Sequence, residues 1–266
     1  MVHVEDRGFQ FADAVYEVVR TYGGRPFALE EHLRRLFRSL DAIQIRHSFT
    51  TEQLAALITE AVARAGFPEA VVYLQVTRGR AARHRGFPSE PRPTLVLTVR
   101  KLESTADVRR TGVRVITLPD TRWAHCDIKS VALLANVLAY NAARQAGAHD
   151  AVFVEADGTV NEATAGNIFV VTGSILRSPP EGPRILSGVT RDKLLRAAAT
   201  AGIPVAEERI QKDELFSASE IFLTSTTAEV VPVISVDGKI TVAGVPGPVA
   251  ARVYEQFVAT LPARLS

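Results

Sequence analysis

The sequence has little of what marks secreted, membrane or nucleic-acid-binding proteins. It contains one cysteine in 266 residues, which excludes a disulfide within the chain. It shows no signal peptide and no apolar run long enough to cross a bilayer. The formal net charge is only +2 with both signs interspersed, so nothing favours a nucleic-acid or membrane partner. We therefore expect a soluble protein of the cytoplasm.

A metal site is also not expected. The six histidines lack the paired spacing of zinc ligands, and the single cysteine cannot supply a thiolate cluster. The chain is long enough to bury a sizeable core, and 47% of its residues are hydrophobic, as in ordinary globular proteins. We predict a small N-terminal α/β domain (1–104), a polar linker (105–111) and a larger C-terminal domain (112–266).

The N-terminal part carries clear helix and strand signals. Thr50-Thr-Glu-Gln53 has the form of a capping box ahead of an apolar helical pattern, and Gly66 is a suitable helix end. Residues 70–76 and 94–99 are rich in β-branched side chains, which is typical of strands.

The C-terminal part also carries strand, turn and helix signals. Asp157-Gly158 predicts a tight turn between strands 151–154 and 168–171. The remaining expected elements are strands 113–117, 220–224 and 230–235 and helices 131–146 and 191–201.

Lys129 is the first candidate for chemistry. It stands just ahead of the apolar run that starts at Val131, where it can become buried. Burial disfavours the charge of a lysine and lowers its pKa, which makes the amine usable for a Schiff base. Taken alone, the residue also fits an exposed charge at a helix start.

Two further segments suit an anion. Gly188-Val-Thr190 precedes a helical run, so its backbone N–H groups lie at a helix N-terminus, where the dipole favours negative charge. Arg35 can donate two parallel hydrogen bonds to a phosphate. Simpler interpretations stay open, because Thr190 and Thr226 also fit caps or turns, and Arg34 with Arg35 also fits the solvated face of an amphipathic helix.

Seven motifs occur in an order and at a spacing that resemble the fold-type IV pyridoxal phosphate enzymes, most closely the bacterial D-amino acid aminotransferases. The resemblance runs from about Glu5 to the C-terminus. Relatives usually have an extra strand pair before the first motif, so we expect either an upstream start or a lost edge hairpin. The motifs are Glu5–Val18, Glu31–Leu36, Thr77–Gly79, Arg122–Ser130, Asn161-Glu162 with Gly166–Phe169, Gly188–Asp192 and Thr224–Glu229.

The resemblance implies a mixed α/β fold with a small N-terminal α/β lobe and a larger C-terminal pseudo-barrel lobe. It implies that Lys129 forms the Schiff base with pyridoxal phosphate and moves the substrate proton, and that Glu162 pairs with the pyridine nitrogen, which must stay protonated. An isolated Glu162 would also fit a solvated hairpin edge. The other implied cofactor contacts are Arg35, Leu186, Val189, Thr190 and Thr226.

Substrate recognition departs from these relatives. They commonly hold the substrate carboxylate with a tyrosine, which is Tyr16 here, and an Arg-x-His trio, which reads Arg83-His84-Arg85 in this chain. An arginine therefore stands where histidine is expected, and it either meets the carboxylate or points into solvent. The resemblance also assigns Val18 and Thr227 to substrate binding.

The implied function is a homodimeric transaminase that moves the amino group of a D-amino acid to 2-oxoglutarate or pyruvate. The D configuration follows from the resemblance alone. Three alternatives remain: an (R)-amine or branched-chain transaminase, an aminodeoxychorismate lyase, and a pyridoxal phosphate protein without catalytic activity.

Overall fold

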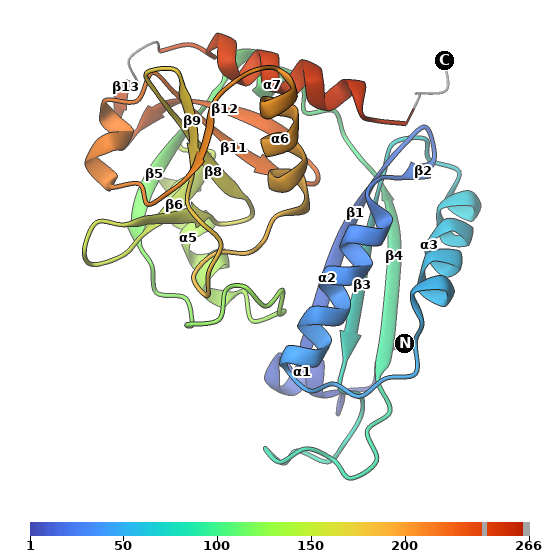
Figure 1. Cartoon of the computed structure of the whole chain (residues 1–266). Helices are drawn as coiled ribbons and strands as arrows, with labels where there is room; N and C mark the ends of the chain where they lie inside the picture. The colour runs from blue at the N-terminus through green and yellow to red at the C-terminus, as the bar shows by residue number, and fades with distance from the viewer. Residues whose placement is uncertain (241–243, 263–266) are drawn as a thin grey trace. The chain divides into compact units, whose positions relative to one another are not determined.

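The computed structural model describes residues 1–240 and 244–262, and the chain divides into two compact units. Unit 1 contains Met1–Glu103 and Ile128–Leu133, with Pro262 at its C-terminal end. Unit 2 contains Ser104–Asp127 and Leu134–Leu261. Figure 1 shows the elements of each unit, and each is described by itself below.

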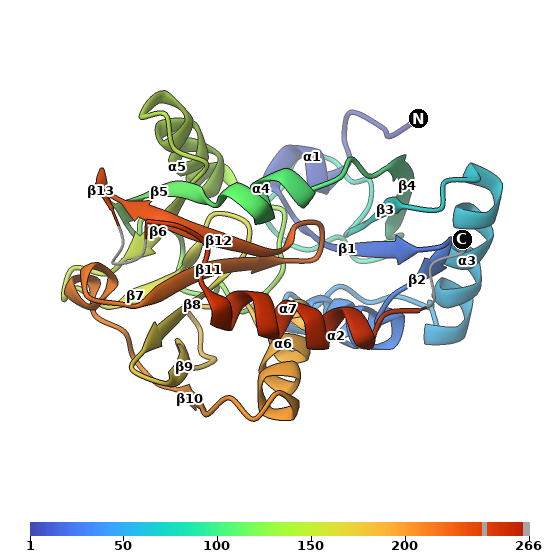
Figure 2. The same ribbon diagram turned by 90° about the horizontal axis from the view of Figure 1, so that it is seen from above.

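Unit 1 is an antiparallel sheet with two long helices on one face (Figures 1 and 2). The strand order is β2-β1-β3-β4. The strands are β1 (Ala14–Tyr22), β2 (Arg25–Pro26), β3 (Ala70–Thr77) and β4 (Thr94–Lys101), and the helices are α1 (Arg7–Phe11), α2 (Leu29–Ala42) and α3 (Thr51–Ala65).

The core of unit 1 forms where alternate strand residues meet the apolar stripes of these helices. On β1, Val15 and Val19 are buried on the helix-covered face, and α2 buries Leu33, Leu36 and Leu40 against it. Side chains on a strand alternate between the two faces, so Tyr16 and Val18 belong to the opposite face of β1.

The capping box predicted for α3 is confirmed. The Thr50 hydroxyl accepts a hydrogen bond from Gln53 N (3.2 Å), and the Gln53 side chain accepts one from Thr50 N (3.0 Å). The helix ends at Gly66, whose φ of 68° is a left-handed conformation that glycine adopts without strain.

Unit 2 is built on a larger, curled mixed sheet, so the predicted fold class is confirmed. Its strand order is β10-β9-β8-β11-β12-β5-β6-β7, and β13 pairs with β12 (Figure 2). The strands are β5 (Val113–Pro119), β6 (Asp150–Val154), β7 (Val160–Ala163), β8 (Asn167–Thr172), β9 (Ile175–Ser178), β10 (Val205–Glu207), β11 (Glu220–Ser225), β12 (Glu229–Val236) and β13 (Lys239–Ile240).

The helices of unit 2 are α4 (Ala106–Thr111), α5 (Leu134–Gln145), α6 (Val189–Thr200) and α7 (Pro248–Ala259), with a 3-10 turn at Lys212–Phe216. None of the described helices combines the length and the apolar character that crossing a membrane requires.

Three predictions about local structure need correction. Residues 105–111, predicted as a linker, contain helix α4. The helix predicted from 131 begins at Leu134, because Ile128–Leu133 joins unit 1. The turn at Asp157-Gly158 connects β6 to β7, whereas β8 pairs with β9 and β11. The domain boundaries themselves stay a prediction.

Candidate functional site

Lys129 lies in a short extended segment that pairs with the edge of β1. Tyr16 N donates a hydrogen bond to Lys129 O (3.0 Å), and Ser130 stands opposite Val15. The Lys129 backbone N–H donates to the Ser39 hydroxyl on α2 (3.2 Å). The position of this lysine is therefore fixed by the sheet and helix of unit 1, and not by the start of α5.

The Lys129 side chain is half-buried beside two tyrosines. Its Nζ lies 4.4 Å from the ring centroid of Tyr16, and Tyr16 stacks on Tyr73 of the neighbouring strand with centroids 5.6 Å apart. Val18 follows on the same face of β1 as Tyr16. Three predicted residues, Lys129, Tyr16 and Val18, are thus brought together by unit 1.

Arg35 is buried, which rules out the solvated-face interpretation for it. Its Nε and Nη2 donate to the two carboxylate oxygens of Glu17 at 2.7 and 2.9 Å, and both side chains are almost fully buried. His32 Nδ1 lies 2.8 Å from the same carboxylate. The neighbouring Arg34 does point outward, and it pairs with Glu30 one helical turn away.

The charges in this cluster are well defined. Burial raises the pKa of the Glu17 carboxyl, but the charge and hydrogen bonds of Arg35, aided by His32, outweigh it and lower this pKa to about 2. Burial lowers the pKa of His32, and Arg35 and Lys129 add to that effect against the opposing pull of Glu17. At neutral pH Glu17 is charged and His32 neutral, so we assign the imidazole proton to Nδ1, which donates to Glu17.

Arg83 and Arg85 lie in the exposed loop between β3 and β4 of unit 1. The guanidinium of Arg83 packs on the ring of Phe11 at 4.9 Å from its centroid. The structure therefore places the Arg83 side chain against α1, the helix that precedes β1.

In unit 2, Glu162 is a buried residue of β7 and not a solvated hairpin glutamate. Its Oε1 accepts a hydrogen bond from Arg122 Nη1 (2.5 Å). Its Oε2 accepts from Asn167 Nδ2 (3.0 Å) and from the backbone N–H of Leu186 (3.1 Å). Three donors from different segments thus fix this carboxylate.

Arg122 joins Glu162 to a second acid. Its Nε and Nη2 donate to the Asp120 carboxylate at 3.0 and 2.7 Å, and Nη2 also reaches Arg184 O. Burial raises the pKa of Asp120, but its hydrogen bonds and charge interaction with Arg122 lower it overall. Arg122 therefore bridges two carboxylates, and Arg184 extends the network by pairing with Glu155 (2.5 Å).

Asn167 contacts three further segments of unit 2, at Leu186, Thr224 and Gly188. It donates to Leu186 O (3.0 Å) and pairs in register with Thr224 of β11. Gly188 packs so closely that a Cβ there would lie 2.0 Å from Asn167 Oδ1. Gly188 also begins α6 without a side-chain cap, so Val189 and Thr190 form an N-terminal turn whose orphan N–H groups suit an anion.

A polar atom that needs a partner lies next to this turn. The Thr224 hydroxyl is buried and has no hydrogen-bond partner among the described residues, an arrangement that costs free energy unless something binds there. Thr226 and Thr227 occupy the tight turn between β11 and β12, where Ser225 Oγ lies 3.5 Å from Thr227 Oγ1. Donors and hydroxyls of this kind fit a phosphate group.

The sequence pointed to some of these residues and missed others. Glu17, His32, Arg122 and Asn167 all lie within quoted motifs but received no role. The available signal was a charged residue inside an apolar alternation at Glu17, and a polar residue at the start of the apolar strand at Asn167. The contact between Arg122 and Glu162 gave no local signal, because 40 residues separate the two.

Comparison with known sequences gives a consistent result. Residues 14–236 match the family model described as amino-transferase class IV. The D-alanine aminotransferase of Bacillus licheniformis is 40% identical over 252 residues, which cover 95% of this chain and 89% of that protein. The D-alanine aminotransferase of Staphylococcus haemolyticus is 34% identical and covers 96% of this chain and 91% of its own.

Solved structures share the fold. A branched-chain aminotransferase from Thermoproteus uzoniensis, solved with norvaline, has a TM-score of 0.89 and 26% identity, covering 97% of this chain and 88% of that one. The branched-chain amino acid aminotransferase of Escherichia coli has a TM-score of 0.92 over 100% of this chain and 91% of its own. Its 24% identity shows the fold alone.

Proposed function

Because the chain belongs to the class IV aminotransferases, we propose that it is a pyridoxal phosphate-dependent transaminase that takes the amino group from a D-amino acid of the D-alanine or D-glutamate type. The acceptor is a 2-oxo acid such as 2-oxoglutarate or pyruvate. The observation that carries this proposal is 34 to 40% identity to D-alanine aminotransferases over nearly the whole chain.

When bound, pyridoxal phosphate supplies an aldehyde that accepts amino groups and a pyridine ring that withdraws electrons. Lys129 is the residue that holds the aldehyde carbon. Once the amino group of the substrate has displaced Lys129 from that carbon, its free amine would take the proton from the substrate α-carbon as general base and return a proton as general acid. The ring centroid of Tyr16 lies 4.4 Å from Lys129 Nζ, so the amine stands on the face of β1 that carries Tyr16.

Glu162 holds the pyridine nitrogen in its protonated form by presenting a carboxylate that is fixed before the cofactor binds. Arg122 and the Leu186 backbone N–H hold that carboxylate in place, so little reorganisation is needed. Leu186 would contact one face of the pyridine ring. The N-terminal turn at Val189-Thr190 and the hydroxyl of Thr226 bind the phosphate, together with Arg35, which is oriented by Glu17.

The substrate carboxylate is held by Tyr16 and Arg83, with Val18 and Thr227 lining the side-chain space. Arg85 stands where relatives have histidine and adds a second positive charge. A second charge favours substrates with a further carboxylate, such as D-glutamate and 2-oxoglutarate.

We propose that the enzyme is a homodimer. Four apolar or aromatic side chains of α5 are exposed in the single chain, and an exposed apolar helix face of this kind suits burial against a second copy. They are Leu134, Val137, Leu138 and Tyr140. The cytoplasm remains the predicted location.

A visible spectrum of the purified protein tests the proposal. Adding D-alanine should replace the absorbance band of the lysine-bound cofactor with that of the amino form, whereas adding L-alanine should leave the spectrum unchanged. Conversion by L-leucine or by (R)-1-phenylethylamine, without conversion by D-alanine, would instead support a branched-chain or an amine transaminase. Borohydride reduction should fix the cofactor on Lys129, and its absence there would reject the residue assignment.

A further inference from the structure

The loop that carries Arg83 and Arg85 is closed at its base. The chain leaves β3 after Thr77 and enters β4 at Thr94, and Gly79 and Arg92 stand at the two ends of the loop between them. Gly79 has a φ of +92°, and a Cβ on it would lie only 1.8 Å from Arg92 O. The two ends of the loop therefore touch, and residues 80–92 form a compact Ω-loop whose shape depends on internal and neighbouring contacts.

The side chain of Arg7 binds backbone carbonyl groups in the middle of this loop. Its side chain is only 4% exposed. Nη1 donates to His84 O (2.6 Å) and Gly86 O (3.2 Å), and Nη2 donates to Arg85 O (3.4 Å). These three carbonyls flank Arg83 on its C-terminal side, so one buried guanidinium fixes the path of the chain next to it.

Arg7 is itself held by Asp13, which also binds Arg78. Asp13 accepts from Arg7 Nε (2.8 Å) and from Arg78 Nε and Nη2 (2.8 and 2.9 Å). Burial raises the pKa of Asp13, but the hydrogen bonds and charges of the two arginines lower it overall, so the carboxylate is charged at neutral pH. One acid thus aligns two planar guanidinium groups.

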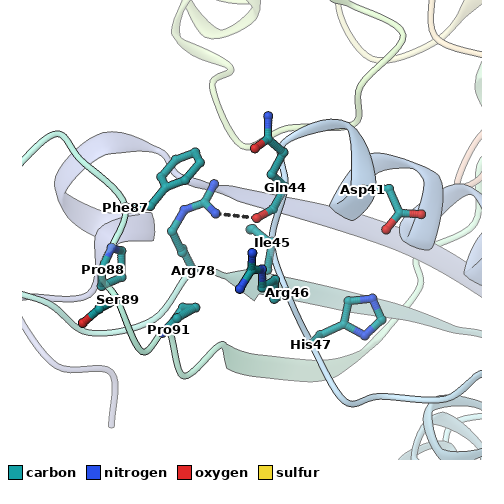
Figure 3. A pocket seen from close by; sticks show the side chains of 10 residues that line it. All are labelled: Asp41, Gln44, Ile45, Arg46, His47, Arg78, Phe87, Pro88, Ser89 and Pro91. Atoms are coloured by element: carbon teal, nitrogen blue, oxygen red, sulfur yellow. Dashed lines mark hydrogen bonds between the residues drawn. The ribbon is translucent and has the colours of Figure 1, made fainter.

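Arg78 supports the far side of the loop. Figure 3 shows its guanidinium between Phe87 of the loop and the segment after α2, where it donates to Gln44 O (2.7 Å). The centre of the guanidinium lies 3.7 Å from the Phe87 ring centroid, a close cation–π contact. The pocket drawn in Figure 3 lies beside this contact and is bounded by Phe87 and Pro91 on the loop side.

Arg83 and Arg7 also share an aromatic support. Both guanidinium groups pack on the ring of Phe11, at 4.9 and 5.0 Å from its centroid. Phe11 ends helix α1, and Asp13 follows two residues later. The position of Arg83 therefore depends on the same short segment as the backbone of its loop.

We propose that Arg7, Asp13 and Arg78 form a clamp that fixes the 80–92 loop so that Arg83 can bind the substrate carboxylate. The clamp residues are positioning residues that act through Arg83. This inference rests on the proposed function, because it needs Arg83 to meet the carboxylate of an amino or oxo acid. It concerns substrate affinity and leaves the chemistry at Lys129 unchanged.

A double-mutant cycle between Arg7 and Arg83 tests the clamp. Arg83→Gln should raise the KM for D-alanine and for the 2-oxo acid by about one to two orders of magnitude, and Arg7→Ala by about tenfold, with kcat changed by less than about threefold. In the Arg83→Gln background, Arg7→Ala should add less than about twofold, because residues that act through one another are not additive.

Arg80→Gln is the matched control. Arg80 belongs to the same loop, but its ion pair with Glu5 is long (3.7 Å) and exposed, so KM should stay within about twofold of the parent. Arg7→Lys keeps the positive charge but lacks the planar guanidinium that binds several carbonyls at once. Compared with Arg7→Ala, it should restore only part of the substrate affinity.

The outcomes separate the inference from the proposed function. A parent enzyme inactive toward D-alanine rejects the proposed function and this inference with it. An active parent in which Arg83→Gln leaves KM unchanged shows that Arg83 does not bind the carboxylate, and the clamp then has no such role. If Arg83→Gln raises KM but Arg7→Ala does not, or if their effects multiply, the clamp is rejected while the proposed function stands.

Discussion

Each unit contains a buried Arg–Glu pair, and the two pairs differ in which member is the predicted cofactor ligand. In unit 1 the predicted cofactor ligand is the arginine, Arg35, and Glu17 orients it. In unit 2 the predicted cofactor ligand is the glutamate, Glu162, and Arg122 orients it. The same ionic contact therefore prepares a cation in one unit and an anion in the other.

The supporting partner differs as well. Glu17 is shared between Arg35 and neutral His32, so one negative charge faces one positive charge. Arg122 is shared between Asp120 and Glu162, so one positive charge faces two negative charges. A buried charge is stable only when it is paired, and in both units the supporting residue is held by a third group. The comparison indicates that breaking the pair in unit 1 mainly costs stability, whereas disturbing it in unit 2 mainly costs rate.

The largest effect is expected from Glu17→Gln. The amide removes the negative charge and leaves the guanidinium of Arg35 buried without a counterion. We expect the free energy of unfolding at pH 7 to fall by about 3 kcal/mol, and bound pyridoxal phosphate to be lost more easily. Urea unfolding followed by circular dichroism, with cofactor content read from absorbance, measures both.

Glu30→Gln is the matched control for that change. It alters the partner of Arg34 on the same helix, but this pair is exposed (69% and 76% for the two side chains), so no measurable loss of stability is expected. Equal losses in the two variants would contradict the buried-pair interpretation.

A smaller effect is expected from Arg122→Lys. Lysine keeps the positive charge but cannot hold Asp120 and Glu162 at once with a planar fork. We expect kcat for D-alanine to fall about tenfold with a smaller change in KM, because the carboxylate of Glu162 is less well fixed. Arg184→Lys should leave kcat near that of the parent, since Arg184 reaches Asp120 but makes no contact with Glu162 in the described network. A fall of the same size in both variants would show that the whole network matters, and not the contact with Glu162.

The sequence predicted those features of the molecule that depend on neighbouring residues. The capping box at Thr50, the end of α3 at Gly66 and most strands were visible because their signals lie within a few positions of one another. Strand β1 was not predicted, because Glu17 and Arg20 interrupt its apolar alternation. Both are buried through partners distant in the sequence, Arg35 for Glu17 and Glu69 for Arg20, which a local pattern does not contain.

The same reason limits the candidate site. Lys129 and Glu162 could be identified through resemblance, but local patterns also fitted the first to a helix start and the second to a solvated hairpin edge. Pairing with β1 fixes Lys129, and the hydrogen bond from Arg122, 40 residues away, helps to fix the Glu162 carboxylate, so both depend on contacts between distant segments. Helix α5 shows the converse: its apolar sequence suggested burial, yet four of its large side chains are exposed.

The smallest effect is a pH dependence carried by His32. Its pKa lies below the usual value of about 6.5 in the folded protein, so the unfolded chain binds the proton more readily. The stability that His32 contributes is therefore present above about pH 6.5 and is lost as the pH falls through that value, by at most about 1.4 kcal/mol per pH unit.

His32→Asn, whose amide can still donate to Glu17, should flatten this slope between pH 7.5 and 5.5 in urea unfolding. His149, whose pKa burial also lowers, is retained in both proteins, so the difference isolates His32. The fall due to Glu17 begins only below about pH 4.5, outside this window. Parallel stability curves for the parent and the variant would show that His32 is not held neutral beside Glu17.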